Sequence, residues 1–253
     1  MSKVARFLKK YWITACIFTG MVLLYIFIAD NKLLNAFLFP PPDSILTAFK
    51  DKKGLMLKNM LASFELMVPA IVISLVIALL VGTVMGMNKK LREWLHPVIY
   101  SISVIPSILL APFALLLAPS FRIASLFLVV YGTIWSILFA TIIGIQTIDK
   151  RYLDNAATLE LHGFKKLTKV ILPAASPSIL AGFVNSLRGS FVILVYAEMY
   201  GTQYGMGYFV KRYSDYGLYS ETWSGFIFMV VVLIVVMQIF EGIKNHMLKW
   251  TIH

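Results

Sequence analysis

Few side chains in this sequence have types and spacings that could do chemistry, and those few stand apart. Arg188, Glu198 and Glu241 are the charged residues within otherwise apolar stretches. His96 and His162 lack the neighbours that would complete a metal site or a general-base pair. There is no nucleophile–base pair, no pair of carboxylates and no Gly-x-x-x-x-Gly-Lys-Ser/Thr loop for ATP phosphates. The sequence predicts no catalytic residue, no metal site and no cofactor bound by this chain.

The composition places the chain in a membrane. Of its 253 residues, 59% are hydrophobic and 14% are charged, whereas soluble domains carry roughly 25% charged residues. A soluble domain of this size could not hide so much apolar surface. The single cysteine, Cys16, allows no internal disulfide. We therefore predict an integral membrane protein and disfavour a disordered chain, a disulfide-rich secreted protein and a free nucleic-acid-binding domain.

Six apolar stretches could position these residues as helices across the bilayer, for which about 20 residues suffice. They cover residues 12–29, 66–87, 94–117, 123–145, 178–199 and 223–243. The first is longer than the apolar region of a signal peptide, so we interpret it as a retained helix. We predict an all-α, polytopic membrane protein with about six transmembrane helices in contact with lipids.

The third stretch, residues 94–117, is interrupted by Pro97, Pro106 and Pro112. Proline removes a backbone donor and must bend or break a helix. Broken helices at membrane depth are tolerated only where protein or a water-filled cavity covers the freed groups. Pro106 and Pro112 are therefore candidates for the wall of a pathway through the protein.

Residues 35–61 differ from the six stretches. Three prolines precede Asp43 and Ser44, either of which could cap a helix. Ile45 and Phe49 lie on the apolar face of that helix, and the charged run ending at Gly54 is expected to end it. We predict a short amphipathic helix on the membrane surface.

Lys and Arg residues indicate the orientation of the chain. With the N-terminus inside, 14 of the 23 Lys and Arg residues fall in inner segments and 8 in outer loops. Inner loops of membrane proteins carry an excess of these residues. We predict that both termini are cytoplasmic. The net charge of +11 then needs no nucleic-acid partner to explain it.

The inner loop at residues 149–173 has a helical pattern of its own. Residues 154–161 are good helix formers, and Gly163 is expected to end their helix. A second amphipathic turn follows, which Pro173 is expected to stop. A loop of this length is unusual between two spans. It either simply connects them or docks to another protein, and the residues alone do not decide between the two. Small residues at 156 and 157 would allow close approach, and Leu159 and Leu161 could act as anchors.

This loop resembles the EAA loop of permease subunits of binding-protein-dependent ABC importers. That pattern reads Glu-Ala-Ala, three residues, Gly, nine residues, Ile-x-Leu-Pro. When the Leu-Pro ending is aligned, Asp154 stands at the Glu position and Glu160 at the Gly position, with a glycine three residues later. The turn after the helix is therefore expected to be displaced to Gly163. The residues that the resemblance assigns to ATPase coupling are Asp154, Asn155, Ala156, Ala157, Leu159, Glu160, Leu161, Gly163 and Pro173.

The resemblance covers roughly residues 40–250. The runs Ile105-Pro-Ser-Ile-Leu-Leu-Ala-Pro112 and Leu172-Pro-Ala-Ala-Ser-Pro-Ser-Ile-Leu-Ala-Gly182 look like the nitrate/sulfonate/taurine-type branch of these permeases. The resemblance implies a type I ABC importer permease fold in one domain, residues 1–253. Within it, residues 12–29 would be an extra N-terminal helix, residues 60–245 approximately the core, and residues 149–173 the coupling loop.

The resemblance also implies partners and a location. A second permease copy or a paralogue would complete the pore. A dimer of ABC ATPase subunits would use ATP and Mg, and an extracytoplasmic solute-binding protein would deliver the solute. The chain would lie in a bacterial inner membrane and would not itself be an enzyme.

Arg188 is the main polar feature of the predicted pathway. A charge at the centre of a membrane helix costs about 2.5–3.5 kcal/mol on insertion scales, so Arg188 either faces a pathway for an anion or is satisfied by a neighbouring helix. Glu198 either serves an outer gate or the binding protein, or is solvated at the interface. Glu241 is expected to reach water at the inner end of its helix. The full set of pathway candidates is Pro106, Pro112, Asn185, Arg188, Tyr196 and Glu198.

The solute is not fixed by the sequence. An anion such as nitrate, a sulfonate or taurine suits Arg188, and the alternative is a thiamine-precursor pyrimidine or another aromatic nutrient. A more remote alternative is a secondary transporter or a membrane scaffold, although no internal repeat or catalytic cluster supports either.

Overall fold

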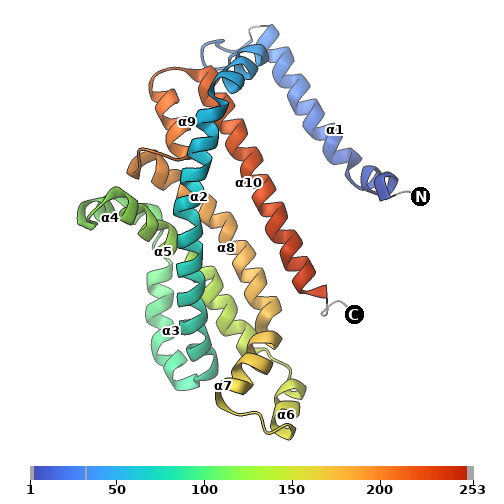
Figure 1. Ribbon diagram of the computed structural model, residues 1–253, viewed down its shortest axis with the longest axis vertical. Coiled ribbons are helices and arrows are strands. Elements are labelled where there is room, and N and C mark those ends of the chain that lie inside the picture. The colour runs from blue at the N-terminus through green and yellow to red at the C-terminus, as the bar shows by residue number, and fades with distance from the viewer. Residues whose placement is uncertain (1–2, 32, 250–253) are drawn as a thin grey trace.

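The computed structural model describes residues 3–31 and 33–249, and every regular element in these two ranges is helical. Figure 1 shows a tall bundle with α6 and α7 at one end and α9 near the other. The all-α fold is confirmed. The elements are α1 (Lys3–Asp30), α2 (Pro42–Met87), α3 (Lys89–Ser103), η1 (Ser107–Leu110), α4 (Ala111–Leu117), α5 (Phe121–Gln146), α6 (Lys150–Thr158), α7 (Gly163–Lys166), η2 (Leu167–Ile171), α8 (Leu172–Gly201), α9 (Met206–Asp215) and α10 (Tyr219–Met247).

Four helical runs in the described chain are long and apolar enough to cross a membrane, namely α2, α5, the run from α7 through α8, and α10. The bent pair formed by α3 and η1–α4 makes a fifth if it counts as one span. Helix α1 contributes the shorter apolar stretch Cys16–Ala29. The predicted count of six is thus not reached by length and composition, because the first apolar stretch is short and the third is broken.

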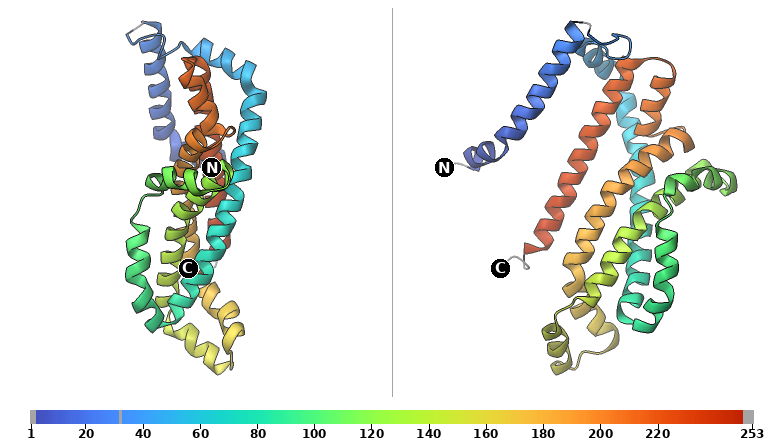
Figure 2. Two further views of the ribbon diagram at one scale, coloured as in Figure 1. Left: turned by 90° about the vertical axis from the view of Figure 1, so that its left-hand side faces the viewer. Right: turned by 180° about the vertical axis from the view of Figure 1, so that it is seen from behind.

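Helix α2 corrects the prediction of a short surface helix ending at Gly54. It runs unbroken for 46 residues, about 69 Å at 1.5 Å per residue, which is more than twice the roughly 30 Å of the hydrocarbon core. Its first half contacts α10 through Phe49 and Phe228 and the start of α9 through Ser63, and Met56 is buried there. Packing on these helices outweighs the roughly 1 kcal/mol that a glycine costs inside a helix. Figure 2 shows this half of α2 at the end opposite to α6.

The third predicted span is broken, as its prolines predict. The break lies at one place and not at each proline. Helix α3 ends at Ser103 and η1 begins after Pro106, and the two parts are bent by 76°. Pro97 lies inside α3 without interrupting it. The carbonyl that Pro97 leaves without a donor belongs to Glu93, in the charged beginning of the helix where water can reach it.

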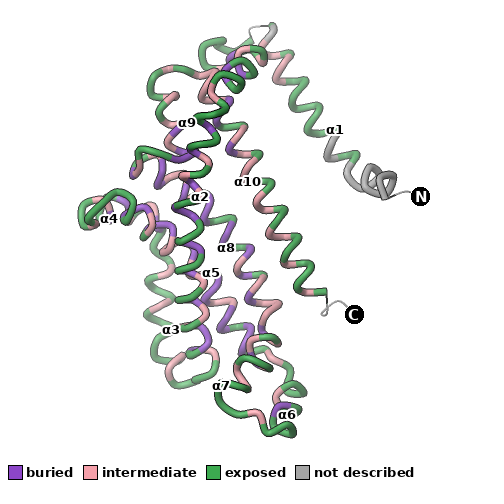
Figure 3. The backbone as a smooth tube through the Cα atoms, viewed as in Figure 1, coloured by how far each residue is buried: buried purple, intermediate pink, exposed green. Residues whose placement is uncertain are grey.

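The core is built on α5, which packs along both α2 and α8. A Cβ atom at Gly82 would lie 2.8 Å from the Cβ of Thr141, and one at Gly86 would lie 2.9 Å from the Cβ of Ile145. On the other side of α5, a Cβ atom at Gly144 would lie 2.8 Å from the Cβ of Ser178. Glycines spaced by four residues let helix backbones approach closely in membranes. Figure 3 shows that buried residues follow α2, α5 and α8, whereas α10 consists mainly of intermediate and exposed residues.

The close approach of α2 and α5 predicts which glycines tolerate a side chain. Gly82→Val should lower the stability of the folded protein by about 1–3 kcal/mol, because the added methyl groups overpack the contact with Thr141. Gly242→Val is the matched control, since its Cβ would meet nothing within 4 Å. Thermal unfolding in detergent measures both. Equal midpoints for the two variants would contradict the close packing.

Candidate functional site

The connection between α5 and α8 forms a compact projection at one end of the bundle (Figure 2). Helix α6 begins after Asp149, whose Oδ1 accepts a hydrogen bond from the Arg151 amide at 2.9 Å. The Arg151 guanidinium donates to Asp149 Oδ2 at 2.6 Å. These hydrogen bonds from Arg151 lower the pKa of the Asp149 carboxyl to about 2. An ionised side-chain cap therefore fixes the start of α6.

The end of α6 corrects the predicted displacement of the turn to Gly163. The helix ends at Thr158, and Glu160 itself adopts the left-handed conformation with φ of 49°. The Leu161 amide donates to the Ala156 carbonyl at 2.9 Å, and the Glu160 amide donates to the Ala157 carbonyl at 3.0 Å. This pair of bonds is the Schellman motif, which usually has glycine at the left-handed position. The turn therefore lies where the family pattern has its glycine, with a glutamate in the strained position.

Gly163 and Pro173 have other roles than those predicted. Gly163 begins α7, with φ of 55°, and does not end α6. Pro173 lies in the first turn of α8 and does not stop a helix, because the chain is helical from Gly163 to Gly201. Residues Leu167–Ile171 form a π-helical segment just before Pro173. Such a bulge shifts the hydrogen-bond register, which lets a proline follow without breaking the helix.

The side chains of this projection divide into a buried and an exposed set. Ala156 is 1% exposed, and Leu153 packs with Ile145 and Ile171 of the adjoining helices. The exposed set faces away from the bundle. Asp154, Asn155, Ala157 and Glu160 are exposed, as are the large apolar side chains of Tyr152, Leu159 and Phe164.

Phe164 is a candidate contact residue that the sequence analysis missed. Its side chain is 77% exposed and that of Leu159 is 70% exposed, at the end of the bundle that carries α6. Leu161, predicted as an anchor, is half-buried. An aromatic residue between Gly163 and two lysines was the available signal. Exposed apolar side chains of this kind mark interaction surfaces.

Arg188 is satisfied by a neighbouring helix. Its Nη2 donates to Glu241 Oε1 on α10 at 3.0 Å, and Lys244 Nζ donates to the other oxygen of Glu241 at 2.7 Å. Glu241 was predicted to reach water at the inner end of its helix. Instead, its carboxylate joins α8 to α10. Asn185, one turn before Arg188, donates instead to the hydroxyl of Ser136 on α5 at 3.2 Å.

Glu198 is buried, with 1% exposure, so the alternative of a carboxylate solvated at the interface is wrong, and a role at an outer gate or toward the binding protein stays a prediction. Its Oε2 accepts a hydrogen bond from the Gly207 amide at 2.8 Å. From α2, Asn59 accepts from the Gly205 amide and Ser63 from the Met206 amide, both at 2.9 Å. We call Asn59, Ser63 and Glu198 the α9 clasp, since they hold three consecutive amides at the start of α9. A carboxylate is also favoured at a helix N-terminus.

Of the remaining pathway candidates, Pro106 and Pro112 are exposed and Tyr196 is half-buried. Pro106 precedes η1 and Pro112 lies in the first turn of α4. The ring of Tyr196 lies 4.9 Å from that of Tyr200, and Tyr196 packs against a cluster that includes Ala114 and Leu128. None of these three residues lines the cavity beside Arg188.

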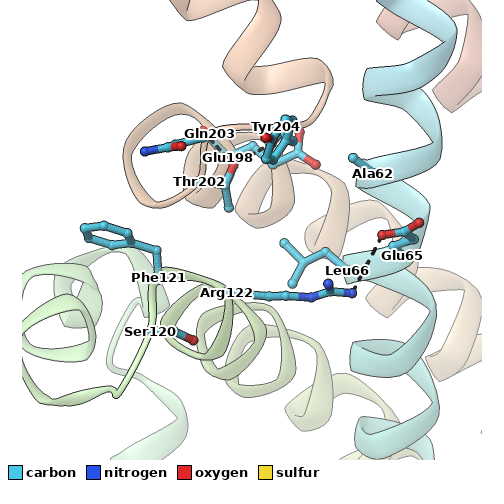
Figure 4. Close-up of a pocket in the computed structure, with 10 residues that line it drawn as sticks. All are labelled: Ala62, Glu65, Leu66, Ser120, Phe121, Arg122, Glu198, Thr202, Gln203 and Tyr204. Atoms are coloured by element: carbon cyan, nitrogen blue, oxygen red, sulfur yellow. Dashed lines mark hydrogen bonds and ion pairs between the residues drawn. The ribbon is translucent and has the colours of Figure 1, made fainter.

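Two cavities adjoin the α9 clasp and share Gln203 and Tyr204 in their walls. The larger, of about 440 Å³, is shown in Figure 4 and lies between α2, the start of α5 and the end of α8. In it Arg122 approaches Glu65, with 3.8 Å between Nη2 and Oε2.

Comparison with known proteins gives the chain a family context. Residues 74–252 match the family described as "Binding-protein-dependent transport system inner membrane component". The candidate aliphatic sulfonates transport permease SsuC of Bacillus subtilis is 24% identical over 96% of this chain and 89% of its own length. The nitrate import permease NrtB of Synechococcus elongatus is 30% identical over 52% of this chain and 47% of its own length. The bicarbonate transport system permease CmpB of the same species is 27% identical over 75% of this chain and 68% of its own length.

The left-handed conformation of Glu160 predicts which substitutions the turn tolerates at this position. Glu160→Gly should keep the fold of α6, because glycine adopts this conformation without strain. Glu160→Val should raise hydrogen exchange of the Leu161 amide by about tenfold, because a left-handed conformation costs about 1–2 kcal/mol in an ordinary residue and more in a β-branched one. Hydrogen exchange with mass spectrometry tests this. Unchanged exchange in the valine variant would contradict the assigned turn.

The Asp149 cap predicts a pH dependence. Because its pKa is lowered from 3.8 to about 2 in the folded protein, its contribution to α6 stability is present above pH 4 and is lost as the pH falls through about 2. Carbon-13 NMR of aspartate-labelled protein should show the low pKa in wild type. Arg151→Gln should move it back toward 3.8, and the control Lys150→Gln should leave it low. A normal pKa in wild type would refute the cap.

Proposed function

The chain belongs to the family of inner membrane components of binding-protein-dependent transport systems, and from this we propose that it forms the translocation pathway of an ATP-driven importer. The observation that carries the proposal is the α6 projection, folded on the bundle yet presenting apolar side chains outward. A loop that only connects two spans has no reason to expose Leu159 and Phe164. A groove on a partner ATPase would cover them.

The structure supports a mechanical role for this projection. Helix α6 is fixed to the α7–α8 rod through the cluster of Leu153, Ile145 and Ile171. The rod from Gly163 to Gly201 has 39 residues, about 58 Å at 1.5 Å per residue. A push on α6 at one end would therefore reach the α9 clasp at the other end. We propose that ATP-driven closure of two ATPase subunits pushes α6 in this way and switches the access of the pathway.

The proposed assembly has further members. A second copy of this chain or a paralogue completes the pore, and a solute-binding protein docks at the end that carries α9. Both termini and the α6 projection then lie in the cytoplasm, in keeping with the distribution of Lys and Arg. ATP and Mg are bound by the ATPase and not by this chain. Pro106, Pro112, Asn185, Arg188, Tyr196 and Glu198 remain pathway candidates in this assembly.

We propose an anion as the solute. Similar proteins are named for aliphatic sulfonates, nitrate and bicarbonate, which are all oxyanions. Taurine belongs to the same chemical class through its sulfonate. An aromatic nutrient such as a thiamine-precursor pyrimidine is the second candidate, and the aromatic cavity walls near α9 are the feature that favours it.

The neighbouring alanines of α6 give a sharp test of coupling. Ala157→Glu should reduce the ATPase recovered with the tagged chain about tenfold or more, as expected for losing a central interface contact, without changing the thermal midpoint. Ala156→Glu should lower the thermal midpoint itself, because position 156 is buried. Ala157→Ser should behave as wild type. Full ATPase recovery and solute uptake with Ala157→Glu would show that α6 is not the coupling surface.

A further inference from the structure

A cavity at the α9 end is lined by two cationic side chains and by no carboxylate. It has a volume of about 230 Å³ and is formed by α2, α9 and the segment between α8 and α9. The Arg212 guanidinium lies 5.9 Å from the ring centres of both Tyr208 and Tyr216. Its Nη1 donates to the Tyr208 hydroxyl at 3.3 Å. Lys58 of α2 lines the same cavity.

These two cations are not neutralised by the protein. The neighbouring Lys211 forms an ion pair with Asp215 on the same helix, whereas no carboxylate in the described ranges lies within 4 Å of Arg212 or Lys58. None of the ten residues that line the cavity is acidic. A concave surface lined by charges of one sign concentrates ions of the opposite sign. The cavity is open to solvent, since Arg212, Tyr204 and Tyr216 are exposed.

The larger cavity, with Arg122 in its wall, adjoins this one. Gln203 and Tyr204 line both, and Arg122 lies deeper along the bundle, where its charge is partly balanced by Glu65 (Figure 4). An anion that leaves Arg212 would therefore meet a second, weaker cationic point. Passage through a membrane protein requires sites that attract an ion but release it again.

We infer that Arg212, Lys58 and the hydroxyls of Tyr208 and Tyr216 form a subsite for a small oxyanion at the outer end of the pathway. The planar guanidinium fork matches the geometry of nitrate, bicarbonate or the head of a sulfonate. The tyrosine hydroxyls supply further donors. The subsite binds the free solute ion on its way to the cavity at Arg122. This inference rests on the proposed function, because it takes the transported solute to be an anion.

The test uses thiol labelling, because the chain has a single cysteine. A Cys16→Ser, Gln203→Cys variant in right-side-out membrane vesicles is labelled with an anionic and a cationic methanethiosulfonate reagent. The anionic reagent carries a sulfonate and so is also a probe of the proposed ligand class. The labelling rate of each reagent is divided by its rate with a free thiol compound in solution. A unit charge about 6 Å away changes each rate roughly threefold in opposite directions, so the anionic reagent should be favoured about tenfold.

Two further variants isolate Arg212. Arg212→Gln should lower the preference for the anionic reagent at least threefold. The double variant Lys211→Gln, Asp215→Asn removes the ion pair next to it without a net change of charge, and it should keep the preference. Sodium methanesulfonate should slow the labelling of the introduced thiol at position 203 at least threefold relative to sodium chloride at equal ionic strength. A Tyr204→Cys variant repeats the measurement at a second position shared by both cavities.

Equal normalised rates for the two reagents, or no labelling at either position, would overturn the inference. Protection by the binding protein but not by methanesulfonate would also overturn it, because the cavity would then accept a carboxylate of that partner and not a free ion. The labelling needs neither ATPase nor binding protein. Uptake driven by both is measured separately, so failure of the importer function is distinguishable from failure of the subsite.

Discussion

The close approach of α2, α5 and α8 is the constraint on which the rest of the structure depends. Inside a membrane, helices gain nothing from leaving lipid, so they associate through close contact and polar bonds. Glycines 82, 86 and 144 remove the side chains that would hold the three backbones apart. Hydroxyls add bonds across the same interfaces, as when Ser178 donates to the Ala140 carbonyl at 2.9 Å. The result is a stiff unit of three helices, with α10 and α1 more loosely attached around it.

This stiff unit has a different polar device at each end. At the α6 end, a charged cap and a Schellman turn fix the two ends of a short helix, and Leu153 packs it on the adjoining helices while its apolar outer side chains stay exposed. At the other end, Asn59, Ser63 and Glu198 hold the first amides of α9. Both devices are connected by one continuous helical rod. A movement imposed on α6 therefore has a direct structural route to the cavities beside α9.

The sequence predicted those features that depend on local patterns. Apolar stretches located the helices, Pro106 marked a break, and the EAA-like run located the short helix α6. The predictions that were wrong failed because contacts between helices decide these features. Packing on α9 and α10 carries α2 through Gly54, and the contacts of Ala156 keep the turn at Glu160 although a glycine stands three residues later. The burial of Glu198 and the pairing of Arg188 with Glu241, 53 residues apart, depend on which helices lie side by side, and spacing within one helix does not reveal that.

Purification of the tagged chain from its native membrane in a mild detergent tests the central claim most directly. We expect an ATPase subunit to be recovered at a ratio of about one per chain, with ATP hydrolysis that is stimulated by a solute-binding protein from the same cell. A chain that remains monomeric, with no ATPase in any mild detergent, would contradict the proposed importer.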